Sequence, residues 1–274
     1  MPRVISLAYL TSAPLDPPGQ IALAARLGYQ AVGLRVLPAV PGGPCSPLIE
    51  DPALMRETRA RIRETGVPVL DMEIVRIGPD FRRDAFQPFL DACSAVGARA
   101  ILVAGDDPDE ARLTASFAAF CAAAARHGLT ADLEFMPWTR VPDARTALRI
   151  VTRAGQPNAR LLVDALHAGR SRTTLADLAA IPRERLGYAQ ICDAPAGIPE
   201  SQEALIRAAR SERLLPGEGG IDLAGIFAQL PRDLPISVEI PNDARKAAVG
   251  VEAWSRQALA ATRDFLASHD RDSA

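Results

Sequence analysis

Lysine is almost absent from this sequence, since Lys246 is the only lysine among 31 basic residues. We therefore do not expect Schiff-base chemistry, because a single residue would have to carry it. A strong excess of charge is also lacking: the net charge is −2 and the isoelectric point is about 6.0. Proteins that bind nucleic acid or an acidic membrane surface usually carry a basic excess, so neither partner is expected.

Long apolar runs are missing as well. None approaches the roughly 20 residues that a membrane span needs. The first residues, MPRVISLAYLTSAP, lack the extended apolar stretch of a signal peptide. Cysteines are few and fall singly, without a CxxC pair, at Cys45, Cys93, Cys121 and Cys192. Such spacing predicts free thiols rather than a disulfide framework. These absences together predict a soluble protein of the cytoplasm.

The sequence does contain short apolar runs that alternate with helical patterns from end to end. At 274 residues, 48% hydrophobic and 23% charged, it has ordinary globular composition. Strands are expected at residues 4–9, 31–37, 69–74, 100–104, 130–135, 160–163, 187–192 and 236–240. Helices are expected at residues 21–27, 55–65, 85–96, 111–126, 144–154 and 244–267, with a polar tail at 270–274.

Eight strands alternating with helices predict an α/β fold, a single (β/α)8 TIM barrel that occupies residues 1–274 as one domain. A doubly wound, dinucleotide-binding sheet would place glycines in the turn after its first strand. Residues 9–14 read YLTSAP and contain no glycine. The sequence therefore favours the barrel.

Four successive expected strands end in a polar side chain. These residues are Glu134 in LEFMPW, Asp164 in LLVDALH, Gln190 in YAQICD and Glu239 in ISVEIP. In a barrel the carboxyl ends of the strands meet at one mouth, where the chemistry takes place. Any one of these acids, taken alone, could equally cap a helix or pair with an arginine. A further acid, Asp193, follows the same strand as Gln190, and it could simply cap the next element.

A divalent metal ion would explain all four residues at once. A charged or amide group inside an apolar strand costs several kcal/mol unless it is satisfied, and three converging carboxylates repel one another. Oxygen ligands, with glutamine at the third position, favour Mn²⁺ or Mg²⁺, while Co²⁺ or Zn²⁺ are possible. We predict that Glu134, Asp164, Gln190 and Glu239 bind one such ion.

These segments resemble the xylose isomerase-like TIM-barrel superfamily, which holds sugar isomerases and epimerases, inosose dehydratase and 3-dehydroshikimate dehydratase. The resemblance runs from ARLGYQAVGLR to VEIPND, and it implies the same four metal ligands. It further implies that His167, in a D-x-x-H motif, binds substrate, as does Glu218 in LLPGEGGIDLAGIF. The Q-I-x-D-A-P and E-I-x-N-D contexts resemble the dehydroshikimate dehydratase branch, whereas strand 2 ends in Gly33-Leu34-Arg35 without the acidic residue of the family pattern.

The resemblance implies removal of a proton from a carbon next to a carbonyl. Glu134 and Glu239 would act as an acid–base pair, assisted by His167, in an isomerase or epimerase acting on a sugar or keto-polyol. A metal-dependent lyase of the 3-dehydroshikimate or inosose dehydratase type is the alternative. A non-catalytic, ligand-binding barrel is the second alternative, and a homodimer is possible in each case.

Substrate contacts are expected from a few side chains near the strand ends. Arg35 and Arg76 could hold a carboxylate or phosphate, which would favour a keto-acid substrate. Trp138 could line the pocket or simply pack at its rim, and His167 could be bonded to a neighbour only. Three further arginines, Arg207, Arg210 and Arg213, are expected on a solvated helix face. The substrate itself would be selected by the loops at residues 38–47 and 198–215.

Overall fold

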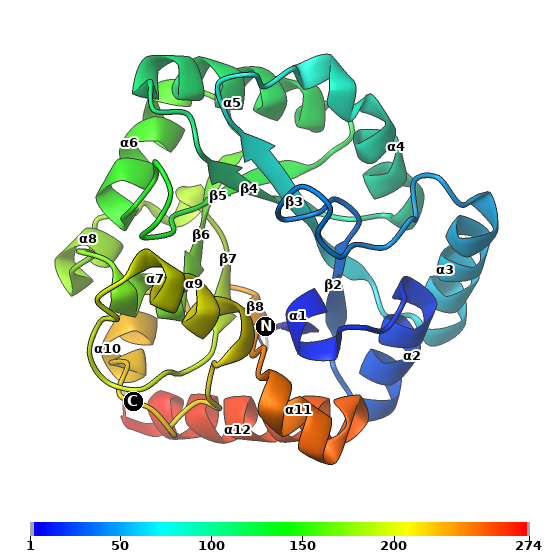
Figure 1. Cartoon of the computed structure of the whole chain (residues 1–274), viewed down its shortest axis with the longest axis vertical. Helices are drawn as coiled ribbons and strands as arrows, with labels where there is room; N and C mark the ends of the chain where they lie inside the picture. Colours follow the sequence, from blue (N-terminus) through cyan, green and yellow to red (C-terminus); the bar gives the residue numbers. More distant parts are fainter. Residues whose placement is uncertain (1–2, 273–274) are drawn as a thin grey trace.

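Eight parallel strands close into a barrel in sequence order, and the last strand pairs back onto the first (Figure 1). The structure is a computed structural model in which residues 3–272 are described. The strands are β1 (Ile5–Leu7), β2 (Ala31–Arg35), β3 (Val69–Ile77), β4 (Ala100–Gly105), β5 (Thr130–Glu134), β6 (Ala159–Asp164), β7 (Leu186–Ile191) and β8 (Ile236–Val238). The predicted (β/α)8 barrel is confirmed.

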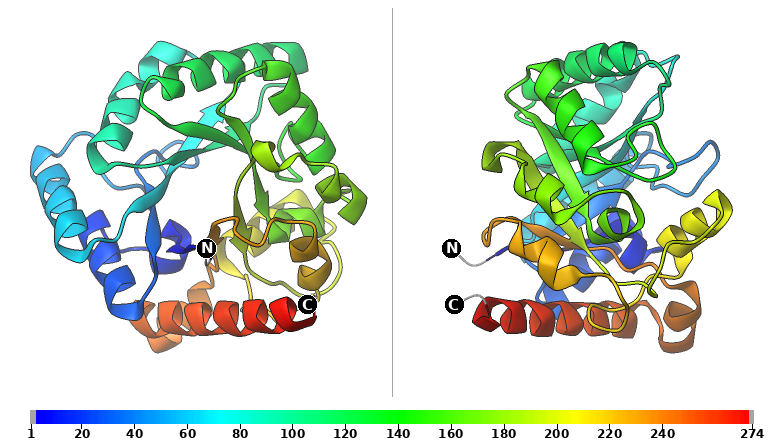
Figure 2. Two further views of the ribbon diagram at one scale, coloured as in Figure 1. Left: turned by 180° about the vertical axis from the view of Figure 1, so that it is seen from behind. Right: turned by 90° about the vertical axis from the view of Figure 1, so that its left-hand side faces the viewer.

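Helices surround the barrel as an outer layer (Figures 1 and 2). The longer ones are α2 (Pro17–Leu27), α3 (Pro52–Thr65), α4 (Gln87–Val96), α5 (Glu110–Ala125), α6 (Ala144–Ala154), α9 (Gln202–Ser211) and α12 (Val251–Asp272). The shorter ones are α1 (Tyr9–Ser12), α7 (Ala165–Arg170), α8 (Leu175–Ala179), α10 (Leu223–Ala228) and α11 (Asp243–Val249), with 3₁₀ turns η1 (Arg83–Phe86) and η2 (Arg183–Arg185).

Aspartates begin several of the outer helices. The side chains of Asp16, Asp51, Asp109 and Asp143 accept hydrogen bonds from backbone N–H groups in the first turns of α2, α3, α5 and α6. Such caps satisfy donors that have no partner within the helix. The main hydrophobic core lies between these helices and the outer face of the barrel, where Phe117, Phe120 and Trp254 are buried.

Several element ends differ from those expected. The first strand stops at Leu7, because the chain turns into α1 at Tyr9. The expected 198–215 loop contains α9. The single helix predicted at 244–267 is wrong: α11 and α12 are separate, because Gly250 has a φ of 83° and a ψ of 157°, which no helical residue adopts. The predicted tail at 270–274 is helical to Asp272, and its last two residues lie outside the described part of the chain.

The side view shows which end of the barrel carries the long connections. In Figure 2, α9, α11 and the loop between β2 and α3 project on one side, beyond the carboxyl ends of the strands. Within residues 3–272, no helix is both long and apolar enough to cross a membrane. The cysteines are unpaired, with Cys45 exposed and Cys93, Cys121 and Cys192 buried.

Candidate metal and substrate site

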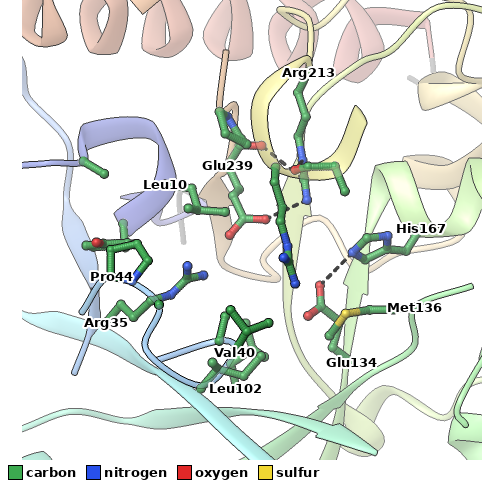
Figure 3. A pocket seen from close by; sticks show the side chains of 18 of the residues that line it. Leu10, Arg35, Val40, Pro44, Leu102, Glu134, Met136, His167, Arg213 and Glu239 are labelled. Carbon is green, nitrogen blue, oxygen red and sulfur yellow. Dashed lines mark hydrogen bonds and ion pairs between the residues drawn. The ribbon is translucent and has the colours of Figure 1, made fainter. Parts of the chain in front are cut away.

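A cavity of about 470 Å³ opens at the carboxyl ends of the strands (Figure 3). Its wall combines apolar side chains such as Leu102 and Met136 with Glu134, His167 and Glu239. This location is where the barrel fold places catalytic groups. An apolar cavity with a few converging polar groups is also the usual form of a small-molecule site.

The four residues predicted as metal ligands come from four consecutive strands. Glu134 and Asp164 are the last residues of β5 and β6, and Gln190 pairs in register with Asp164. Glu239 follows directly after β8, where its N–H donates to the carbonyl of Ile191 at 3.2 Å. All four side chains are buried. All four residues thus lie at strand ends around the barrel mouth, but of this set only Glu134 and Asp164 fall, together with His167, within one cluster of potential ligand atoms.

The D-x-x-H motif is built around the start of a helix. Asp164 is the N-cap of α7, and its Oδ1 accepts the backbone N–H of His167 at 3.0 Å. This places the imidazole beside β5, with Nε2 3.5 Å from Glu134 Oε1. One potential ligand atom from each of Glu134, Asp164 and His167 lies within 4.8 Å of the others. His167, expected to contact substrate, thus stands close enough to be a ligand as well.

Arg213 is buried in the same mouth, and the prediction that it belongs to a solvated face is wrong. Only 2% of its side chain is exposed. Its Nη1 donates to Asp164 Oδ2 at 2.6 Å. Its Nη2 lies 2.9 Å from Glu239 Oε2, and Figure 3 shows this pair. Arg213 lies beyond the end of α9. The spacing of residues on a helix therefore does not predict the direction of its side chain. The one sequence feature that could have indicated its burial is its position directly before the glycine-rich segment at residues 214–227.

Burial dominates the proton affinities in this cluster. It raises the pKa of Glu134 well above its usual range, and the negative charges of Asp164 and Glu239 add to the effect. Burial also raises the pKa of Glu239 to about 7, against the opposing charge of Arg213. For Asp164, burial acts upward but the Arg213 guanidinium prevails and lowers the pKa. Burial lowers the pKa of His167 to about 4, so the imidazole is neutral at pH 7.

The donor set fits a divalent cation. Three carboxylates meet in the mouth, and Arg213 offsets only one of their charges. Both amide atoms of Gln190 are buried without a hydrogen-bond partner among the described residues. Since a buried amide rarely remains unsatisfied, an additional group that binds its oxygen is called for. Carboxylate, amide and imidazole donors together are ligands that several divalent metals accept.

The other predicted substrate residues are placed unequally. Arg35 and Arg76 both line the cavity. The guanidinium of Arg35 donates to Glu73 Oε2 at 2.6 and 2.9 Å, so the carboxylate at this level comes from β3 rather than β2. Arg76 is paired with Asp106 and donates to the carbonyl of Ala39 at 2.6 Å.

Of Trp138 and Glu218, only Trp138 lies at the cavity wall. Trp138 lines the cavity and meets His167 edge to face, with ring centroids 5.0 Å apart. Such a contact fixes the orientation of the imidazole. Glu218 instead pairs with Arg245 on α11, and the structure does not bring it to the cavity wall. Its part in substrate binding gains no support from this position.

Asp193 organises the glycine-rich segment instead of capping a helix. Its carboxylate accepts backbone N–H groups from Gly217 at 3.0 Å, Gly219 at 2.9 Å and Ile221 at 3.2 Å. A Cβ at Gly219 would stand 2.3 Å from Asp193 Oδ1, so only glycine fits there. The spacing of the D-A-P and P-G-E-G-G segments thus reflects one loop held by one buried acid.

Comparison with known proteins settles the family. The sequence pattern of the xylose isomerase-like TIM-barrel family matches residues 21–266. The chain belongs to this family.

Two curated relatives of the chain are 3-dehydroshikimate dehydratases. The one from Pseudomonas aeruginosa is 33% identical over 129 residues, covering 46% of this chain and 20% of that protein. The one from Pseudomonas putida is 25% identical over 218 residues, covering 70% of this chain and 32% of that protein. The chain therefore spans about a fifth to a third of the length of these relatives.

Solved structures share the fold at low identity. A protein titled IolI, with a bound zinc atom, has a TM-score of 0.77 at 16% identity and covers 97% of this chain and 98% of its own. D-allulose 3-epimerase from Methylomonas, in complex with D-allulose, has a TM-score of 0.68 at 17% identity, covering 96% and 97%. The chain thus shares its fold with an epimerase, and its sequence is similar to those of dehydratases.

Proposed function

We propose that the protein is a divalent-metal-dependent lyase of the dehydratase type, acting on a hydroxylated keto-acid. The observation that carries this proposal is the buried cluster of Glu134, Asp164 and His167, with Glu239 and Gln190 beside it. The choice of dehydration over isomerisation draws on the relatives named 3-dehydroshikimate dehydratase. It replaces as first candidate the isomerase or epimerase expected from the sequence.

Glu134, Asp164, Gln190 and Glu239 would hold the metal. When bound there, a divalent ion polarises a substrate carbonyl and stabilises the negative charge that develops on its oxygen. Mn²⁺ and Mg²⁺ suit the oxygen donors, and the proximity of His167 also suits Co²⁺ or Zn²⁺. Arg213 keeps Asp164 and Glu239 oriented through its two ion pairs.

The side chains around the cavity supply the proton transfers. Glu239, whose carboxylate lies at the cavity wall, would take a proton from a carbon activated by the carbonyl. The electron pair of that C–H bond forms the new C=C bond, while the C–O bond of a neighbouring hydroxyl breaks. The leaving oxygen takes up the proton that Glu239 removed and departs as water, which returns Glu239 to its carboxylate form. His167, held by Asp164 and Trp138, would donate a hydrogen bond to that oxygen.

Isomerisation or epimerisation is the second candidate, and one geometric feature favours it. Glu134 and Glu239 enter the cavity from different sides, as Figure 3 shows. One carboxylate could remove a proton from a substrate carbon and the other could return it to the opposite face. In that case no water would be lost and no conjugated product would form.

Incubation of the metal-loaded protein with 3-dehydroshikimate distinguishes these candidates. A dehydratase produces an aromatic product, which absorbs in the near ultraviolet. In NMR spectra the product signals grow while those of the substrate disappear. An epimerase or isomerase incorporates deuterium from D₂O into ketoses or inososes without loss of water. Glu239→Gln should lower kcat by at least about 100-fold, in keeping with loss of a general acid–base group, whereas Glu252→Gln on the exposed face of α12 should leave it unchanged. A protein that retains no metal and turns over none of these compounds would instead be a non-catalytic binding barrel.

A further inference from the structure

Cationic side chains gather at the cavity mouth, and most of them are already tied to neighbouring acceptors. Five cationic side chains line it, and they are Arg35, Arg76, Arg210, Arg213 and Lys246. Glu73 binds Arg35, and Asp106 binds Arg76. Arg213 is bound by two carboxylates of the predicted metal site. The remaining two cations require a separate account.

Arg210 has no carboxylate or carbonyl partner among residues 3–272. It lies in the last turn of α9, and its side chain is exposed toward the cavity mouth. Lys246 differs, because its Nζ donates to the carbonyl of Leu10 at 3.3 Å and Asp243 lies on the same helix, α11. Arg210 is therefore the cavity-lining arginine whose hydrogen-bonding capacity is left for a ligand.

The surroundings of Arg210 are themselves positive. Partial burial lowers the pKa of its guanidinium, and the charges of Arg76 and Arg35 lower it further. Arg35 and Arg76 each have a carboxylate partner, whereas Arg210 adds a third guanidinium without one among the described residues, and like charges in one cavity repel. An anionic ligand group at this point would relieve that repulsion, and the planar fork of arginine matches a carboxylate through two parallel hydrogen bonds.

We propose that Arg210 binds a carboxylate of the substrate and selects acidic over neutral substrates, with Arg76 and Arg35 supplying the surrounding positive field. This inference rests on the proposed function, because it assigns the substrate class of the same cavity. Arg76 is fixed by Asp106 and the Ala39 carbonyl, so its guanidinium contributes charge from a set position. Arg210, free of such ties, makes the direct contact.

Calorimetric titration of the metal-loaded protein with two matched probes tests the assignment. The probes are 3,4-dihydroxybenzoate, which carries a carboxylate, and 1,2-dihydroxybenzene, which does not. Arg210→Gln should weaken binding of the benzoate by about 10- to 100-fold, the range expected for a charge-assisted hydrogen bond. It should change binding of the neutral probe by less than about twofold. Arg207→Gln is the matched control, because Arg207 lies on the same helix, is exposed and pairs with Glu212.

Three outcomes would overturn the proposal. The first is wild-type protein that binds the benzoate no more tightly than the neutral probe. The second is an Arg210→Gln protein that loses both probes equally, which would indicate a general effect on the cavity. The third is Arg210-dependent binding of D-fructose 6-phosphate without binding of the benzoate, which would assign the position to a phosphate. None of these measurements requires turnover, so loss of the proposed dehydratase activity and loss of the carboxylate contact remain distinguishable.

Discussion

Asp71 is a carboxyl group buried outside the cluster of Glu134, Asp164 and His167. Its carboxylate lies against β2, where a Cβ at Gly33 would stand 2.6 Å from Oδ1. Neither carboxylate oxygen forms a well-aligned hydrogen bond among the described residues, although the Tyr188 hydroxyl lies close enough to act on its pKa. Burial raises the pKa of Asp71 well above its usual range, and the charges of Glu73 and Glu239 raise it further. The folded protein therefore keeps Asp71 protonated at pH values where the unfolded chain has lost that proton.

This difference predicts a pH dependence of stability. A group whose pKa is higher in the folded state contributes its full stabilisation below the pKa of the unfolded chain. That stabilisation is lost as the pH rises through the pKa of the folded state. From about pH 4 upward, the free energy of unfolding should fall by up to about 1.4 kcal/mol per pH unit through this one group. Asp71→Asn removes the titration, so its slope between pH 5 and 8 should be shallower. Urea unfolding at several pH values, with a chelator present, measures both slopes.

Asp264→Asn on α12 is the control, because that side chain is exposed. Its slope should match that of the unsubstituted protein. Equal slopes for Asp71→Asn and the unsubstituted protein would mean that Asp71 is ionised in the folded state, and this account of its burial would then be wrong.

Residues at or near the strand ends could be placed from the sequence, whereas residues in the long connection after β7 could not. Glu134, Asp164 and Gln190 interrupt apolar runs whose ends the sequence marks, so their common level follows from the barrel. Arg213 and Arg210 belong to a connection, and only the tertiary fold turns one of them into the cluster and the other toward the cavity. The local sequence has no periodic pattern that predicts the direction of these two side chains.

At the scale of elements, the loop after β7 depends on a single acid. Asp193 accepts three N–H groups from residues 217–221 and a fourth from Ala194 at 2.8 Å. Hydrogen bonds to a charged, buried acceptor are worth about 1.5–3 kcal/mol each. Asp193→Ala should therefore speed amide hydrogen exchange in residues 214–222 by at least about tenfold, since about 1.4 kcal/mol of local stability corresponds to that factor.

Hydrogen-exchange mass spectrometry measures this effect directly. Asp143→Ala is a comparison, because it removes one N-cap bond of α6, to Thr146, without touching the loop. That change should cost about 1 kcal/mol and leave exchange in residues 214–222 as it was. Unchanged exchange in the Asp193→Ala loop would show that the segment is held by other contacts.

Element types were easier to predict than element ends. Strong apolar runs identified all eight strands, whereas the short helices α7, α8 and α10 are too brief for a helical period to emerge. The break at Gly250 was missed because good helix formers lie close by on both sides, Ala247 and Ala248 before it and Glu252 and Ala253 after it. Here backbone conformation, rather than composition, separates the two helices.

At the scale of the whole molecule, barrel closure gathers side chains that lie more than 100 residues apart, as from Glu134 to Glu239, into one mouth. The cluster is unfavourable by itself, because burial and mutual repulsion raise the pKa of both glutamates. A bound cation would offset this repulsion in the folded protein, and it would not bind the unfolded chain, in which these carboxylates are far apart. Binding should therefore stabilise the whole barrel, by about 2.7 kcal/mol at a metal concentration 100 times the Kd.

Calorimetric titration of the chelator-treated protein with Mn²⁺ is the most direct test of the metal site. We expect saturable binding of one ion per chain, accompanied by a higher Tm. Glu134→Gln should weaken that binding by at least tenfold, while Glu252→Gln on α12 should not. Absence of saturable binding by Mn²⁺, Mg²⁺, Co²⁺ and Zn²⁺, or an affinity unchanged by Glu134→Gln, would contradict a metal site at the mouth of this barrel.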